Sequence, residues 1–410
     1  MNRRRVVVTG MAGISPIGNR WADVERVLHA RQNAVRHMGE WDDIKGLNTR
    51  LGAPAAPFEL PEHFSRKRTR SMGRIALMAC LASEWALTDA GLLGSPVLTS
   101  GRTGVSYGSS LGEPAAITDF SRLIQDRTLD GLNANSYLRL MSHTAPVNIA
   151  VFFGLTGRVI TTSSACTSGS QGIGYAFETI RHNLADVMIA GGAEELCPSE
   201  AAVFDALFAT STRNDAPATT PRPYDRDRDG LVIGEGAATL ILEELEHART
   251  RNARIYAEIV GFGTNCDGAH VTQPQAETMA IALKLALADA GLPAEAIGYV
   301  NGHGTATELG DIAESKATHA IFGEKMPISS LKSYIGHTLG AAGALEAWMT
   351  IEMMRAGWFA PTLNLDQVDP RCAPLDYVRG DGRTLDCGYT MSNNFAFGGI
   401  NTSLIFKRLD

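Results

Sequence analysis

The sequence predicts an α/β protein built from two related halves, and two observations support this fold class. Apolar runs typical of buried strands alternate with helical patterns along the chain, as in layered α/β proteins. The strand-like runs are 6–9, 104–107, 187–190, 236–242, 255–260, 299–300, 391–392 and 402–406, and the helical patterns are 21–28, 75–90, 243–251, 276–290 and 341–355. We expect the glycines that follow residues 9 and 190 to end those two strands.

The second observation is a similarity between two distant stretches. Residues 159–166 and 327–332 each lead into a helix made of small residues, which indicates an internal duplication. The predicted domains are therefore residues 1–250 and 251–410.

Length and composition limit the kinds of protein that this chain can be. Its 410 residues, 44% of them hydrophobic, are enough for a large core. A formal net charge of −7 gives no indication of a nucleic acid or an anionic membrane as partner. Residues 1–10 carry three arginines followed by only three valines, so we expect no signal peptide, and no stretch has the length of a membrane span. Six scattered cysteines without a zinc motif favour free thiols in a reducing cytoplasm.

Cys166 is the strongest candidate for a nucleophile. It lies among small and hydroxyl residues at 161–170, between a strand-like run and a helical pattern. Free N–H groups and the helix dipole at such a turn lower a thiol pKa, so we expect a reactive thiolate. The remaining cysteines lack this setting and are interpreted as small buried residues: Cys80, Cys197, Cys266, Cys372 and Cys387.

Two histidines are each preceded by glycine. His303 lies in Asn-Gly-His-Gly-Thr and His337 in Ile-Gly-His-Thr-Leu-Gly. Glycine lets a ligand or another backbone segment approach closely. Either histidine alone is equally well explained as part of a turn. With Cys166, however, the pair indicates covalent acyl chemistry on sulfur with two imidazoles near the reacting carbonyl.

Further polar residues fit the same kind of site. Lys332 has apolar neighbours and Asp311 or Glu314 as candidate partners for a partly buried ion pair. Thr305 and Thr307 alternate, so in an extended segment their hydroxyls face one side, which suits a long polar ligand arm. The glycine-bearing loop 392–401 is either an ordinary turn or a source of backbone donors with an aromatic gate.

Together these motifs resemble the β-ketoacyl-(acyl carrier protein) synthases, condensing enzymes with a thiolase-like fold, over essentially the whole chain. The similarity is closest to the type I and II synthases, which elongate acyl chains. The matching stretches are 163–169, 303–307 with Gly310, Asp311 and Glu314, Lys332 with 336–343, 191–197, and 394–401. The resemblance implies a layered α-β-α-β-α architecture of two duplicated halves. It also implies a homodimer, acyl carrier protein as the partner, and no cofactor.

The resemblance implies catalytic roles for five residues. Cys166 would be the nucleophile, and His303 and His337 would act on the malonyl thioester. Lys332 and Glu314 would form a supporting charge pair. The expected reaction is the decarboxylative condensation of malonyl-acyl carrier protein with a cysteine-bound acyl chain.

It also implies binding roles. Thr305 and Thr307 would contact the phosphopantetheine arm, and the backbone N–H groups of Cys166 and Phe397 would form an oxyanion hole. Phe397 would gate the acyl pocket, and Phe204 would line it. No catalytic metal is expected, but relatives hold a structural monovalent cation near positions that correspond to Asn301, Glu346, Ser392 and Asn393.

The gate loop departs from the family pattern Gly-Phe-Gly-Gly-Thr-Asn, because Ala396 and Ile400 replace its glycine and threonine. If position 396 requires a positive φ, alanine there stiffens the gate. This departure favours a dedicated polyketide or polyene pathway slightly over housekeeping fatty-acid elongation.

The densest basic run of the chain contains Arg66, Lys67 and Arg70. The carrier protein of the resembling family is acidic, so we expect this run to dock it. The alternative is a solvated helix face.

Two other functions stay open at this point. One is a role in a heterodimer, either as a chain-length subunit without catalysis of its own or as a synthase that needs a related chain. Cys166 argues against a chain-length subunit, because such subunits carry glutamine at this position. The other is a different cysteine acyltransferase or a thioesterase, which would release no carbon dioxide from a malonyl thioester.

Overall fold

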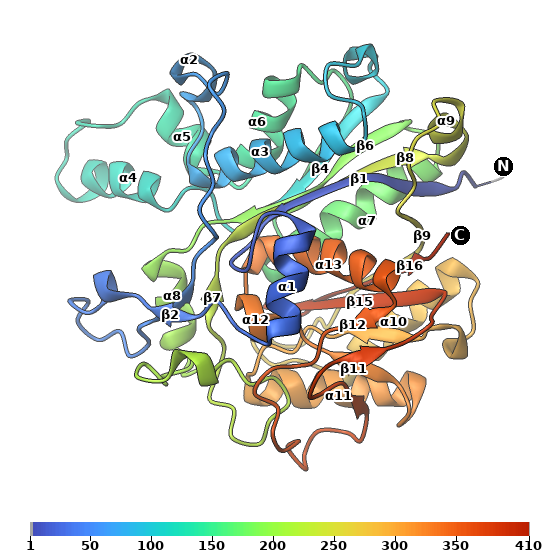
Figure 1. Ribbon diagram of the computed structural model, residues 1–410. Coiled ribbons are helices and arrows are strands. Elements are labelled where there is room, and N and C mark those ends of the chain that lie inside the picture. The colour runs from blue at the N-terminus through green and yellow to red at the C-terminus, as the bar shows by residue number, and fades with distance from the viewer. Residues whose placement is uncertain (1–2, 410) are drawn as a thin grey trace.

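The framework of the protein is one 11-stranded sheet whose two halves have the same strand order and are called the first and the second sheet below (Figure 1). The computed structural model describes residues 3–409, so the outermost ends of the two predicted halves, 1–2 and 410, lie outside the described residues. The first sheet has the order β5 (Val159–Thr162), β4 (Thr103–Gly108), β6 (Val187–Glu194), β8 (Gly236–Glu244), β1 (Val6–Ile14). The second has the order β11 (Pro327–Ser329), β10 (Tyr299–Asn301), β15 (Tyr389–Ala396), β16 (Ile400–Lys407), β9 (Ala257–Cys266), with β13 (Asp376–Tyr377) beside β11.

The duplication is visible in the order and in the direction of the strands. Counted along the chain within each half, both sheets run third, second, fourth, fifth, first. In both sheets the first three strands of this order are parallel to one another. The fourth strand is antiparallel to the third, and the fifth is antiparallel to the fourth. The sheets join through a short antiparallel pairing of β1 with β9 at Val6–Val8.

Helices separate and cover the two sheets. The central pair, α7 (Ser168–Arg181) and α13 (Ala342–Ala356), packs between them. The first sheet is covered on its outer side by α3 (Arg74–Asp89) and α6 (Thr144–Phe153), and the second by α10 (Ala276–Ala290) and α11 (Glu308–Phe322). The predicted α-β-α-β-α architecture is therefore confirmed.

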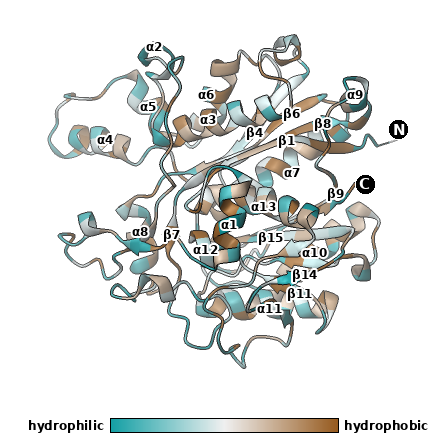
Figure 2. Cartoon of the chain, viewed as in Figure 1, coloured by the Kyte–Doolittle hydropathy of each residue, from teal (hydrophilic) through white to brown (hydrophobic). Residues whose placement is uncertain are grey.

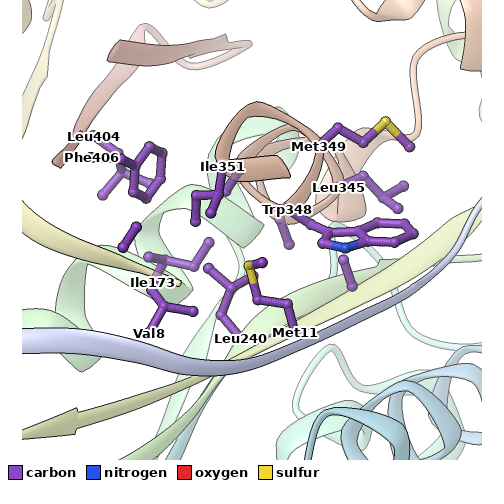
Figure 3. Packing of buried hydrophobic residues seen from close by; sticks show 14 of the residues in the cluster. Val8, Met11, Ile173, Leu240, Leu345, Trp348, Met349, Ile351, Leu404 and Phe406 are labelled. Atoms are coloured by element: carbon purple, nitrogen blue, oxygen red, sulfur yellow. The ribbon is translucent and has the colours of Figure 1, made fainter. Parts of the chain in front are cut away.

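Small residues let the two central helices approach closely. A Cβ on Gly169 would lie 2.9 Å from the backbone nitrogen of Ala344, and one on Gly343 would lie 2.6 Å from that of Ser170. The apolar cluster around these helices draws side chains from both sheets, including Val8, Leu240 and Leu404, against Ile173 and Trp348 (Figure 3). Figure 2 shows hydrophilic colours on peripheral pieces such as α2 (Arg66–Thr69).

Two strands are longer than predicted because their glycines do not end them. β1 continues through Gly10 to Ile14, and β6 continues through Gly191 to Glu194. A Cβ on Gly10 would lie 2.3 Å from the carbonyl oxygen of Ala86 in α3, and one on Gly191 would lie 2.0 Å from that of Ala238 in β8. These glycines therefore permit close packing of extended backbone rather than turns.

The remaining elements lie at the periphery or around the site. The helices are α1 (Trp21–Ala30), α4 (Ala115–Gln125), α5 (Ala134–Leu140), α8 (Pro198–Asp205), α9 (Leu245–Thr250) and α12 (Lys332–Ile335), and the short strands are β2 (Arg36–His37), β3 (Leu51–Ala53), β7 (Ile233–Gly234), β12 (Trp358–Phe359) and β14 (Arg383–Thr384). Among residues 3–409, no helix combines the length and the apolar character needed to cross a lipid bilayer.

Candidate active site

The candidate nucleophile lies in the turn between β5 and α7. Cys166 occupies a single 3₁₀ turn, Ala165–Thr167, and α7 begins at Ser168. Ala165 has a φ of +49°, in the left-handed region, which makes the turn tight. The second half repeats this turn at Leu339, whose φ is +46°, just before α13.

The structure brings Cys166, His303 and His337 together from three distant segments. The Cys166 sulfur and one ring nitrogen from each histidine all lie within 4.8 Å of one another. The two imidazole centroids are 5.1 Å apart and the rings are nearly perpendicular, at 88°. All three side chains are buried. In the described part of the chain, this trio is also the one group of such side chains placed closely enough to share a metal ion. That catalysis needs no metal stays a prediction.

Hydrogen bonds determine which ring nitrogens carry protons. Nδ1 of His337 accepts a hydrogen bond from the backbone N–H of Leu339 at 3.3 Å, and its Nε2 has no partner. Nδ1 of His303 lies 3.5 Å from the amide nitrogen of Asn394, which can only donate. Both rings in their neutral form therefore carry the proton on Nε2, and the Nε2–H of His337 is free to bind an oxyanion.

Both imidazoles remain neutral over a wide pH range. Burial lowers the pKa of His303 and of His337 well below the usual value, and the nearby Lys332 ammonium lowers both further. Neutral imidazoles suit hydrogen-bond donation to a developing negative charge rather than long-range charge attraction.

The expectation of a lowered thiol pKa at Cys166 is wrong for the protein without substrate. Burial raises the pKa of Cys166 to about 11, although Lys332 and the backbone N–H groups of Phe397 and Cys166 itself act to lower it. The helix terminus is present, but desolvation of the thiolate outweighs it. The same contacts place the two predicted oxyanion-hole donors, the N–H groups of Cys166 and Phe397, at the sulfur.

This gives a testable pH dependence for the resting enzyme. Because the folded-state pKa is raised, the thiolate fraction should increase about tenfold per pH unit through the neutral range. We expect the rate of Cys166 alkylation by iodoacetamide, followed by mass spectrometry of the modified peptide, to rise steadily from pH 7 to about pH 10. A plateau already at pH 7–8 would show that the thiol pKa is low after all.

The predicted charge pair between Lys332 and Glu314 is wrong. The Lys332 ammonium donates to Glu346 in α13, and the two side chains are 1% and 0% exposed. Glu314 instead accepts hydrogen bonds from the backbone N–H groups of His303 at 2.5 Å and Gly304 at 2.7 Å. Its other donor is the Tyr224 hydroxyl at 3.0 Å, and burial raises the pKa of Glu314 to about 7. Glu314 therefore holds the His303 loop in place.

A buried network that the sequence did not indicate runs from Lys332 to His303. Glu346 accepts from Lys332 on one oxygen and from the amide of Asn394 at 2.7 Å on the other. The same amide faces Nδ1 of His303. Asn394 belongs to a matching motif, but no spacing rule connects it to a histidine 91 residues away.

The trio opens into a cavity of about 530 Å³. Four of the predicted binding residues line it: Thr305, Thr307, Phe204 and Phe397. The hydroxyl oxygens of Thr305 and Thr307 are 2.8 Å apart and therefore face the same side. The rings of Phe204 and Phe397 pack at 5.1 Å between centroids, tilted by 38°. The cavity of Cys166 therefore offers hydroxyl groups for a polar arm and aromatic surface for an apolar chain.

The gate loop is a tight hairpin turn between β15 and β16. Ala396 is the last residue of β15, pairs with Ile400, and does not have a positive φ. The left-handed conformations fall on Gly398, with φ +87°, and Gly399, with φ +72°. The suspected strain at Ala396 is therefore absent, and the glycines of the loop meet its conformational requirement.

Three of the four residues predicted around a monovalent cation, Asn301, Ser392 and Asn393, are buried where β10 pairs with β15, and the fourth, Glu346, is buried in α13. The Asn301 amide donates to the Ser392 hydroxyl at 3.1 Å, while Oδ1 of Asn301 and both amide atoms of Asn393 have no hydrogen-bond partner. Buried amide oxygens without a donor fit a hard cation. Glu346 is already bonded to Lys332 and Asn394, so the fit rests on the two asparagines and Ser392.

The predicted docking residues are exposed and do not line the cavity. Arg66 and Lys67 lie on α2, and Arg70 follows it. None of them lines the cavity, and Figure 1 shows α2 on the side of the first sheet that carries α3 and α6.

Among the other cysteines, Cys266 is exposed and Cys197 partly exposed, so the interpretation as buried residues is wrong for these two.

A buried cysteine at a strand-to-helix turn, two neutral imidazoles and a duplicated thiolase-like fold define a condensing acyltransferase. Comparison with family models agrees: residues 3–248 match "Beta-ketoacyl synthase, N-terminal domain" and residues 256–366 match "Beta-ketoacyl synthase, C-terminal domain". The chain belongs to the β-ketoacyl synthase family.

Named relatives and solved structures agree over the full length. The chain is 39% identical to 3-oxoacyl-[acyl-carrier-protein] synthase 2 of Vibrio cholerae, covering 100% of both chains. It is 59% identical to a β-ketoacyl synthase of Burkholderia phymatum, with a TM-score of 0.98 and coverage of 99% and 100%. It is 31% identical to the ishigamide ketosynthase/chain length factor, with a TM-score of 0.90 and 100% coverage of both.

Proposed function

We propose that the chain condenses a cysteine-bound acyl group with malonyl-acyl carrier protein and releases 3-oxoacyl-acyl carrier protein and carbon dioxide. The observation that carries this proposal is the meeting of the Cys166 sulfur with His303 and His337 within 4.8 Å in one cavity. A chain-length subunit without catalysis would not need this trio, and the curated sequence relatives are named as 3-oxoacyl-[acyl-carrier-protein] synthases.

The first step transfers the acyl group. The Cys166 sulfur attacks the carbonyl of an acyl-carrier thioester, the bond to the pantetheine sulfur breaks, and the thiol proton of Cys166 ends on that leaving sulfur. The backbone N–H groups of Cys166 and Phe397 bind the tetrahedral oxyanion. The raised pKa of Cys166 means that proton loss accompanies attack rather than preceding it.

In the second step malonyl thioester occupies the vacated arm site. Its carboxylate leaves as carbon dioxide, and the electron pair forms an enolate whose charge lies on the thioester oxygen. The Nε2–H groups of His303 and His337 hydrogen-bond this oxygen. The enolate carbon then attacks the acyl-Cys166 carbonyl, the Cys166 thiolate leaves, and a solvent proton restores the thiol.

The proposal is tested with the purified chain alone. It is incubated with acyl-carrier thioester and malonyl-carrier thioester labelled in the free carboxyl. Labelled carbon dioxide in equal amount to the 3-oxoacyl product supports the proposal. Acyl-Cys166 that is hydrolysed without carbon dioxide release would instead identify a thioesterase. Activity only with a related second chain would identify a partner-dependent subunit.

The role of His303 and His337 in decarboxylation should be separable from the role of Cys166 in acylation. Replacing His303 or His337 with alanine removes one donor to the enolate, so malonyl decarboxylation should fall about 10²–10³-fold, while Cys166 acylation persists. Labelled carbon dioxide release and acyl-enzyme mass spectrometry measure the two steps. The exposed His182 is the control, since His182→Ala should change neither. Loss of acylation in the His337 variant would contradict this division of work.

We further propose that Arg66, Lys67 and Arg70 dock an acidic carrier protein, supported by their exposure and like charge. Changing Arg66 and Lys67 to glutamate should raise the KM for carrier-bound substrate about tenfold at low salt with little change in kcat, and the difference should shrink at high salt. Lys284→Glu, on exposed α10 surface, is the matched control. An unchanged KM would rule out docking at α2.

We also propose that two copies of the chain form a homodimer. Edge strand β5 and the neighbouring α6 expose Val159 at 45% and Val151 at 74%, which supports pairing of two copies along this edge. We also propose 1–250 and 251–410 as the domains, a structural monovalent cation beside Asn301 and Asn393, and a cytoplasmic location, which the free cysteines favour.

A further inference from the structure

A group of carboxylates lies beside the apolar residues that surround Cys166. Its members are Glu113, Glu194, Glu195, Glu200 and Glu235, which come from four segments of the first half. Glu194, Glu200 and Glu235 are at most 6% exposed. The field of Glu194 reaches the Cys166 sulfur.

Glu194 and Glu235 have hydrogen-bond partners, Glu113 and Glu195 each have one buried oxygen without a partner, and Glu200 has no partner on either oxygen. Arg74 binds Glu235 through two hydrogen bonds of 2.6 and 2.8 Å. Glu194 accepts from the backbone N–H groups of Ser110 at 2.8 Å and Gly340 at 2.9 Å. Both carboxyl oxygens of Glu200 are buried without any hydrogen-bond partner. Burial and the neighbouring acids raise the pKa of Glu200 well above its usual value.

The helix that carries Glu200, α8, also contributes Phe204 to the lining of the cavity. Glu200 and Phe204 are four residues apart on α8, so they share one helix face. Phe204 packs against Phe397, and Ala201 and Phe204 belong to the same apolar cluster as Cys166. Glu200 itself does not line the cavity, so an acyl chain on the sulfur reaches its carboxyl only by continuing past Phe204 along α8.

We propose that Glu200 selects acyl chains that carry a hydroxyl group at their far end. The inference rests on the proposed function, since it concerns the acyl group bound to Cys166. The hydroxyl donates to Glu200 and satisfies a carboxyl that is otherwise buried without a partner. A chain ending in a methyl group leaves this carboxyl unpaired, and sites built to bind a substrate hydroxyl reject the analogue that lacks it.

The test compares ω-hydroxyacyl- and plain acyl-carrier thioesters of equal length over a series of lengths. The rate of acyl-Cys166 formation is followed by mass spectrometry. We expect the wild-type protein to prefer the hydroxylated chain at its best length by at least about tenfold. Glu200→Leu should reverse the preference, and Glu200→Gln should keep part of it, because an amide oxygen still accepts a hydrogen bond. Glu277→Leu, at an exposed position in the first turn of α10, is the control and should behave like the wild type.

The outcomes separate the two proposals. If Cys166 is labelled faster by plain acyl chains than by hydroxylated chains at every length, the inference alone is overturned. The same holds if Glu200→Leu leaves the preference between the two kinds of chain unchanged. Absence of any labelled Cys166 with all thioesters overturns the proposed function and the inference with it. Thermal unfolding of each variant checks the fold, and we expect Glu200→Leu to raise the Tm, since it removes a buried carboxyl without a partner.

Discussion

Cys166→Ala should abolish both acylation and condensation, lowering the condensation rate by at least about 10⁴-fold. The sulfur is the group to which the acyl chain is bonded, and among residues 3–409 no other cysteine lines the cavity. Because Cys166 is buried between α7 and the gate loop, neither bulk water nor a second thiol can replace it there. Mass spectrometry after incubation with an acyl-carrier thioester measures the loss. Cys266→Ala, which removes an exposed thiol, should retain full labelling.

Cys166→Gln should separate the two halves of the reaction. The glutamine amide fills the acyl position, while His303 and His337 keep their donors to the enolate. Decarboxylation of malonyl-carrier thioester should therefore continue without condensation. If this variant releases no labelled carbon dioxide, the histidines alone do not account for the enolate.

Lys332→Met should be the most destabilising single change near the site. It leaves the Glu346 carboxylate, which is 0% exposed, without its cation, and breaking a buried ion pair in this way costs about 3–5 kcal/mol of unfolding free energy. The pKa values of His303 and His337 should rise at the same time, because Lys332 lowers both. Denaturant unfolding measures the first effect and NMR titration of the imidazoles the second.

The matched variants distinguish this ion pair from an ordinary contact. Lys332→Met combined with Glu346→Gln should recover much of the lost stability, since no unpaired charge remains. Arg249→Met, which breaks an exposed pair with Glu246, should leave unfolding unchanged within experimental scatter. A Lys332→Met protein as stable as the wild type would mean that Glu346 takes up a proton instead.

Local patterns and motifs predicted a large part of the molecule. The helix at 276–290 has the bounds that its apolar spacing indicates, because periodicity is a local property. The glycine-flanked histidines and Cys166 could be singled out from their neighbours, since close approach to a reacting carbonyl requires small residues next to them. The resemblance of motifs in order along the chain indicated the duplicated fold, whose matching strand orders the structure shows.

Other features depend on which residues meet across the fold. The partner of Lys332 was wrongly predicted because Glu314 and Glu346 are similarly plausible in sequence, and only the packing of α12 against α13 decides between them. Glycines 10 and 191 indicated turns, whereas the neighbouring backbone makes them parts of strands.

The class of chemistry could be inferred before the fold was known, because a thiol and two imidazoles among small residues are chemical groups whose identity does not depend on folding. The tertiary structure alone decided their protonation, their partners and the unsatisfied carboxyl of Glu200. Burial raises the pKa of the Cys166 thiol and lowers that of both imidazoles, and desolvation is a property of everything packed around a group.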